Sequence, residues 1–125
     1  FIGSPQMNLI RGKASGGEVS LGAYQLPVGS ANLDSKHTDV TIGVRPEAWR
    51  LVSKEDGGLP VNVAVVEELG SDGYVYGSCD VEGTPHDLTI RVNARDTVHK
   101  GETLYVTTDP HQVHVFDSES GERIN

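Results

Sequence analysis

The chain has 125 residues, of which 36% are hydrophobic and 15 are glycine, and this composition predicts one globular domain with a core rather than a disordered segment. Ten Lys and Arg residues against 18 Asp and Glu give a net charge of -8, which argues against nucleic acid or an anionic membrane surface as a partner. The single Cys excludes an internal disulfide, and no apolar run approaches the roughly 18 to 20 residues that span a bilayer.

Apolar residues alternate with a period of two along most of the chain, which predicts short β-strands. In chain order the expected strands are MNLIRGKA (7–14), VSLGAYQLPV (19–28), DVTIGV (39–44), LPVNVAVV (59–66), GYVYGSCDV (73–81), HDLTIRV (86–92), TLYVTT (103–108) and QVHVF (112–116). In the fourth of these we expect Leu59, Val61, Val63 and Val65 on one face.

The segments between these strands are rich in Gly, Asp and Ser, and turns recur at intervals of roughly ten residues. Residues 30–39 are expected to form a loop, and PEAWRLV (46–52) is the one helical candidate because Pro suits a first helical position. The predicted fold class is therefore all-β, a small barrel or sandwich with little helix.

Phosphate-binding chemistry is poorly supported by the glycines. A phosphate loop needs the pattern G-x-x-x-x-G-K-[ST], and Gly17 and Gly22 have the glycine spacing but are followed by Ala23 and Tyr24. We interpret these glycines as turn residues, and we assign no cofactor-binding residue to this chain.

Metal and nucleophilic chemistry are also poorly supported. His111 and His114 would point to opposite faces of a strand, and a Cys₂His₂ site would need a second Cys. Cys79 lies in a strand-like run where a small buried residue is the ordinary interpretation. Glu67 and Glu68 are adjacent on a strand, so they do not face a common substrate. We predict no catalytic and no metal-binding residue, and no enzyme activity for this chain by itself.

Four short stretches, in order, resemble the ATP-binding subunits of carbohydrate-type ABC importers, the maltose, trehalose and glycerol-phosphate class. They are FIGSPQMN at 1–8, GVRPE at 43–47, VVEELG at 65–70, and HVFD followed by GERI at 114–124. The resemblance implies that the whole chain is a single C-terminal regulatory domain of the TOBE kind, a β-barrel related to OB folds. Residues 1–6 would then be the remnant of an interdomain linker, with Pro5 as its hinge and Phe1 and Ile2 loosely held.

The resemblance also implies function. The domain would be non-catalytic, would stabilise the subunit dimer and would couple or control ATP-driven solute uptake, while the parent subunit would bind ATP and Mg. Its partners would be its own nucleotide-binding domain, a second copy of the subunit, the permease subunits and possible regulatory proteins. The location would be cytoplasmic, peripheral on the inner face of the cell membrane.

Five residues of the matched motifs are candidates for a regulatory or interdomain surface: Gly43, Arg45, Glu47, Glu67 and Phe116. Gly43 in a strand indicates a bulge or a close backbone approach. Arg45 and Glu47 flank the rigid Pro46, and either a structural ion pair or a protein-docking contact would explain them.

Two other functions stay open at this stage. One is a small-oxyanion or sugar-binding module of the TOBE type, for which Ser30, Ser71, Ser78 and Lys100 are available ligands. The other is single-strand nucleic-acid binding on tyrosine platforms, which the acidic balance disfavours.

Overall fold

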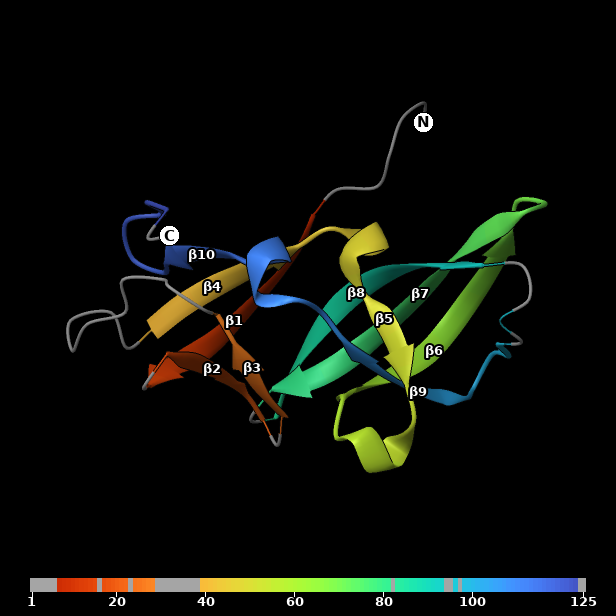
Figure 1. Ribbon diagram of the computed structural model, residues 1–125, viewed down its shortest axis with the longest axis horizontal. Coiled ribbons are helices and arrows are strands. Elements are labelled where there is room, and N and C mark those ends of the chain that lie inside the picture. The colour runs from red at the N-terminus through yellow and green to blue at the C-terminus, as the bar shows by residue number, and fades with distance from the viewer. Residues whose placement is uncertain are drawn as a thin grey trace.

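The computed structural model describes residues 7–15, 17–22, 24–28, 39–81, 83–93, 96 and 98–123 (Figure 1). Within these residues the chain forms ten strands and three short 3₁₀ helices. The strands are β1 (Asn8–Ser15), β2 (Glu18–Leu21), β3 (Tyr24–Pro27), β4 (Asp39–Val44), β5 (Arg50–Val52), β6 (Leu59–Glu68), β7 (Asp72–Val81), β8 (Thr84–Asn93), β9 (Thr103–Thr107) and β10 (His114–Asp117). The 3₁₀ helices are η1 (Pro46–Ala48), η2 (Lys54–Asp56) and η3 (Pro110–Gln112).

The strands form two five-stranded antiparallel sheets. Sheet A has the order β10-β4-β1-β2-β3, and sheet B has the order β5-β9-β6-β7-β8. Figure 1 shows the two sheets side by side, with the closed end of the β6–β7 hairpin projecting away from sheet A. The chain crosses from sheet A to sheet B at η1 and returns at η3. The all-β class that the alternating pattern predicts is thereby confirmed.

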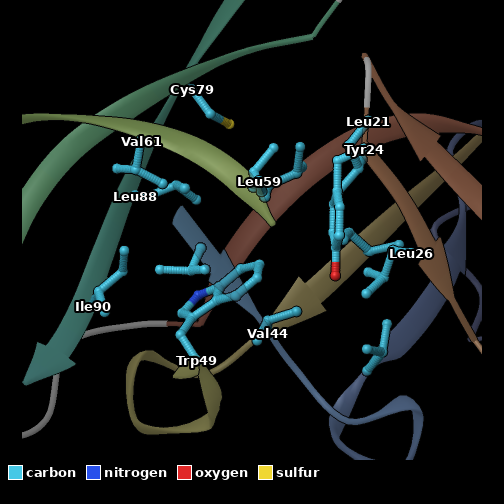
Figure 2. Packing of buried hydrophobic residues seen from close by; sticks show 14 of the residues in the cluster. Leu21, Tyr24, Leu26, Val44, Trp49, Leu59, Val61, Cys79, Leu88 and Ile90 are labelled. Atoms are coloured by element: carbon cyan, nitrogen blue, oxygen red, sulfur yellow. The ribbon is translucent and has the colours of Figure 1, made fainter. Parts of the chain in front are cut away.

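One hydrophobic core lies between the sheets and takes side chains from both (Figure 2). Ile10 and Ile42 come from sheet A, Leu59 and Ile90 come from sheet B, and all four are at most 1% exposed. Trp49, which follows η1, packs among them and is 4% exposed. Each such buried side chain contributes about 1.5–3 kcal/mol relative to an exposed one, so this core is the main source of stability.

Three hydrogen bonds that involve side chains also join the sheets. The Asn8 Nδ2 group donates to the Thr89 carbonyl oxygen at 2.8 Å, and the Thr89 backbone N–H donates to Asn8 Oδ1 at 2.8 Å. The Tyr24 hydroxyl on β3 and the Thr107 hydroxyl on β9 share a hydrogen bond of 2.7 Å. Asn8 and Tyr24 are both buried, so these contacts fix how sheet A lies against sheet B.

The structure corrects three local predictions. The run 19–28, expected as one strand, contains parts of two strands, β2 and β3, which pair antiparallel with Leu21 opposite Tyr24. Val65 is not on the face of Val63, because the register of β6 against β7 shifts between them and leaves Val65 55% exposed. The segment 46–52 is not one helix: η1 ends at Ala48, and Arg50 begins strand β5. The expectations for Phe1, Ile2, Pro5 and residues 30–38 lie outside the described residues.

Candidate functional site

The outer face of sheet A gathers three of the five candidate residues. In the register of β10, β4 and β1, His114 lies opposite Gly43 and Gly43 opposite Leu9. The next outward row is Phe116, Thr41 and Arg11, and Arg45 follows β4 at the corner. The alternate row of Val115, Ile42 and Ile10 is buried in the core, which fixes the first two rows as the outward-facing ones.

Gly43 is needed for the way Met7 lies on this face. A Cβ atom at Gly43 would lie 2.8 Å from both Sδ and Cε of Met7, so the thioether rests directly on the backbone of β4. The sequence indicated a bulge or a close backbone approach at Gly43, whereas the register of β4 is regular there and the group that approaches is a side chain. Met7 and Leu9, which is 55% exposed, together form an apolar strip beside His114.

The η1 corner presents Arg45 and Glu47 to solvent. Pro46 and Ala48 are buried, and the Ala48 N–H donates to the Arg45 carbonyl oxygen at 3.0 Å. The Thr108 hydroxyl donates to the Ala48 carbonyl oxygen at 2.7 Å in a buried position, which anchors the corner. No ion pair joins Arg45 to Glu47 among the described residues, so both charges are available at the surface.

Positive charge collects along the β10 edge of the same face. Arg123 pairs with Phe116 through an isolated bridge, which places it on the outer side of β10. Partial burial first, and then the nearby charges of Arg123 and Arg45, lower the pKa of His114 below its ordinary value. In a chain with a net charge of -8, the outer face of sheet A thus combines the positive charges of Arg45 and Arg123 with exposed apolar side chains.

Glu67 lies elsewhere, on the projecting β6–β7 hairpin. It lines a hollow of about 370 Å³ together with Glu68, Asp72, Asp96 and His99. Its carboxylate accepts a 3.3 Å hydrogen bond from the Tyr76 hydroxyl, and the pKa of Tyr76 is raised by desolvation and then by Glu67. The structure therefore does not bring Glu67 together with the outer face of sheet A.

The other chemically interesting groups remain separate. Cys79 is buried and its pKa is raised to about 11, mainly by desolvation, so its thiol stays protonated. Among the described residues no group of three His, Cys, Asp or Glu side chains is placed to hold a metal ion. Of the suggested oxyanion ligands, Lys100 lines a surface hollow without Ser71 or Ser78, and Ser30 is outside the described residues.

The sequence did not predict the contact of Met7 with Gly43 or the hydrogen bonds of Asn8 with Thr89. Both belong to the first matched motif, yet a strand pattern alone shows only an apolar and a polar residue there. The useful signal was the Gly in the middle of β4, because a missing Cβ in a central strand requires some group to fill its place.

The fold and this surface define an OB-like β-domain without a catalytic constellation among its described residues. Residues 42–116 match the family described as TOBE domain, and residues 3–49 match the family described as MalK OB fold domain. Since the TOBE match covers more than half of the sequence, the chain belongs to the TOBE domain family.

The curated relatives agree with the resemblance inferred from the four motifs, which is confirmed. The chain is 40% identical over 142 aligned positions to the diacetylchitobiose uptake system ATP-binding protein MsiK of Streptomyces coelicolor. This alignment covers 99% of the chain and 38% of MsiK. It is 36% identical to the sn-glycerol-3-phosphate import ATP-binding protein UgpC of Salmonella typhi and 32% identical to UgpC of Escherichia coli K12, with 99% and 35% coverage in both cases.

The chain spans little more than a third of the length of these relatives. Within the described residues, no helix is long and apolar enough to cross a membrane.

Proposed function

We propose that this chain is the non-catalytic regulatory domain of the ATP-binding subunit of an ABC importer for a carbohydrate or a related solute, and that it stabilises the pairing of two subunits. The observation that supports this proposal best is the outer face of sheet A. Leu9 is exposed there beside Met7, and Arg45 and Arg123 give a positive surface to an acidic domain. A surface that combines exposed apolar side chains with charge opposite to the rest of the domain suits a protein partner.

The location of this surface supports a contact with the rest of the subunit or with its second copy. Met7 is the first described residue, and it lies directly on Gly43 in the middle of the face. The buried Thr108–Ala48 hydrogen bond anchors the backbone of the η1 corner, so the position from which the Arg45 side chain leaves is fixed, which reduces the entropy lost on binding.

The remaining parts of the activity belong to the rest of the subunit. ATP and Mg would bind there, the permease subunits would be contacted through it, and the complex would lie on the cytoplasmic side of the membrane. This division fits the names of the relatives, which are ATP-binding proteins of uptake and import systems.

Deletion of residues 7–125 from the complete subunit tests the proposal. We expect the truncated subunit to retain ATP hydrolysis when assembled with the permease but to pair more weakly in sedimentation velocity and to lose control of transport. If pairing and transport control were both unchanged by the deletion, the proposed function would be wrong.

A further inference from the structure

A second concave surface lies where β1 passes the start of β8. This groove, with a volume of about 420 Å³, is lined by Arg11 and Lys13 from β1, Thr84 and His86 from β8, Asp39 at the start of β4, and Ser118 after β10. The volume is in the usual range for a small-molecule site. The groove joins residues that are far apart in the sequence, so the fold itself creates it.

The charge of the groove is opposite in sign to the net charge of the chain. Arg11 and Lys13 are cationic, and Asp39 is the one described carboxylate among the lining side chains. Asp39 is already paired, because the Lys13 ammonium group donates to its Oδ1. The groove therefore has a net positive charge in a chain whose net charge is -8.

Two of its donors are available for a ligand. Arg11 is exposed and makes no ion pair with a described carboxylate. The His86 Nδ1 atom lies 3.1 Å from the Thr84 carbonyl oxygen, which can only accept, so Nδ1 has the hydrogen. This leaves Nε2 without a partner among the described residues, as an acceptor when the ring is neutral and a donor when it is protonated.

Hydroxyl groups complete the donor set. Thr84 contributes one to the lining, and the Ser118 hydroxyl shares a 3.0 Å hydrogen bond with Thr41 that leaves it a second hydrogen-bonding position. A planar guanidinium, an imidazole and hydroxyls around one hollow match the several acceptor oxygens of a tetrahedral anion.

We propose that the β1–β8 groove binds a phosphate-type dianion, either inorganic phosphate or the phosphate group of a small phosphomonoester, with Arg11 and His86 as its main ligands. The groove borders the outer face of sheet A at Arg11, but it includes none of Met7, Leu9, Arg45 or Arg123, on which the proposed protein contacts rest. It also uses none of Ser30, Ser71, Ser78 or Lys100. It would give the domain a ligand-binding function in addition to its protein contacts, so that either proposal can fail without the other.

A heteronuclear NMR titration at fixed ionic strength tests the site, with inorganic phosphate, glycerol phosphate and, in a third arm, vesicles containing phosphatidic acid. We expect saturable shifts at the amides of Arg11, Thr84, His86 and Ser118 with inorganic phosphate or glycerol phosphate, and the arm that gives them identifies the ligand. Shifts with the vesicles alone would overturn the assignment to a small phosphate. The substitution Arg11→Gln or His86→Gln should weaken the affinity about tenfold, as loss of one charge-assisted hydrogen bond predicts.

The matched controls are Arg50→Gln and His111→Gln, which remove the same side-chain types from exposed positions outside the groove. Their affinities should remain within about twofold of the original. The proposal would be overturned by no saturable shifts with any probe, or by shifts that Arg11→Gln and His86→Gln leave unchanged.

Discussion

The carboxamide of Asn8 makes both backbone hydrogen bonds of Thr89, at 2.8 Å each, and so acts as a one-residue strand partner for β8. β8 is an edge strand of sheet B, and Asn8 opens β1 in the middle of sheet A. The contact is buried at Asn8, which is 6% exposed. One side chain thereby closes part of a sheet edge and holds the two sheets together.

The first prediction concerns this contact. Asn8→Ala would leave the Thr89 N–H and C=O groups without their partner, and we expect it to lower the free energy of unfolding by about 1–3 kcal/mol. Asn8→Asp should be at least as damaging at neutral pH, because a carboxylate cannot donate to the Thr89 carbonyl oxygen. Urea unfolding at equilibrium measures both. Asn93→Ala, an exposed position on the same strand, is the control, with an effect below about 0.5 kcal/mol. An Asn8→Ala protein as stable as this control would contradict the interpretation.

The second prediction compares two strand glycines. A Cβ at Gly43 would meet only the flexible end of Met7, so Gly43→Ala should cost less than about 1 kcal/mol of unfolding free energy. A Cβ at Gly77 would overlap the backbone carbonyl oxygen of Asn62, so Gly77→Ala should cost more than about 2 kcal/mol. Denaturant unfolding of the two variants measures the difference.

A double-mutant cycle separates the two causes. In a Met7→Ala background the cost of Gly43→Ala should disappear, while the cost of Gly77→Ala should remain the same. Equal costs for Gly43→Ala with and without Met7 would show that the thioether does not rest on this glycine.

The third prediction is a pH dependence due to His114. Its folded-state pKa is lowered from the ordinary value of 6.5, first by desolvation and then by Arg123 and Arg45. The folded protein therefore favours the neutral ring, and the resulting stability is fully present above pH 6.5 and is lost as the pH falls from 6.5 through the folded-state pKa. We expect His114→Gln to reduce the loss of stability between about pH 7.5 and pH 5.5.

His111→Gln is the control for this effect. His111 is exposed on η3, and its substitution leaves His114, Arg123 and Arg45 unchanged. Its stability should follow the original pH profile. If both substitutions left the profile unchanged, then His114 would not be the titrating group.

Period-two alternation was sufficient to predict most strands, because each sheet has one buried and one exposed face and a strand between them must alternate. Val65 shows where the rule stops. The extra residue at the register shift turns the side chains of the following part of β6 to the opposite face of the sheet. The sequence LPVNVAVV contains no residue type that marks the position of this shift. The division of ten strands into two sheets is also a property of distant pairings, such as β1 with β4, that no local pattern contains.

The candidate site could be predicted only in part, for a similar reason. Gly43, Arg45 and Phe116 stand in matched motifs and lie on one face, whereas Glu67 lies in an equally recognisable motif on the far hairpin. The β1–β8 groove was not predicted at all. Arg11 and His86 are 75 positions apart and line one groove because β8 packs against β1, which is a tertiary contact.

The central claim is that the outer face of sheet A makes the contacts that support subunit pairing. Sedimentation velocity of the complete ATP-binding subunit tests it with the pair Leu9→Asp and Arg45→Glu, which changes one exposed apolar and one exposed cationic side chain on this face. The matched control is Val65→Asp on β6 with Lys100→Glu in the turn before β9, which line one hollow away from this face. Val65 is as exposed as Leu9, 55% in both cases. We predict weaker pairing for the first variant and unchanged pairing for the second. Equal pairing in both variants, or weakening in the control alone, would contradict the account.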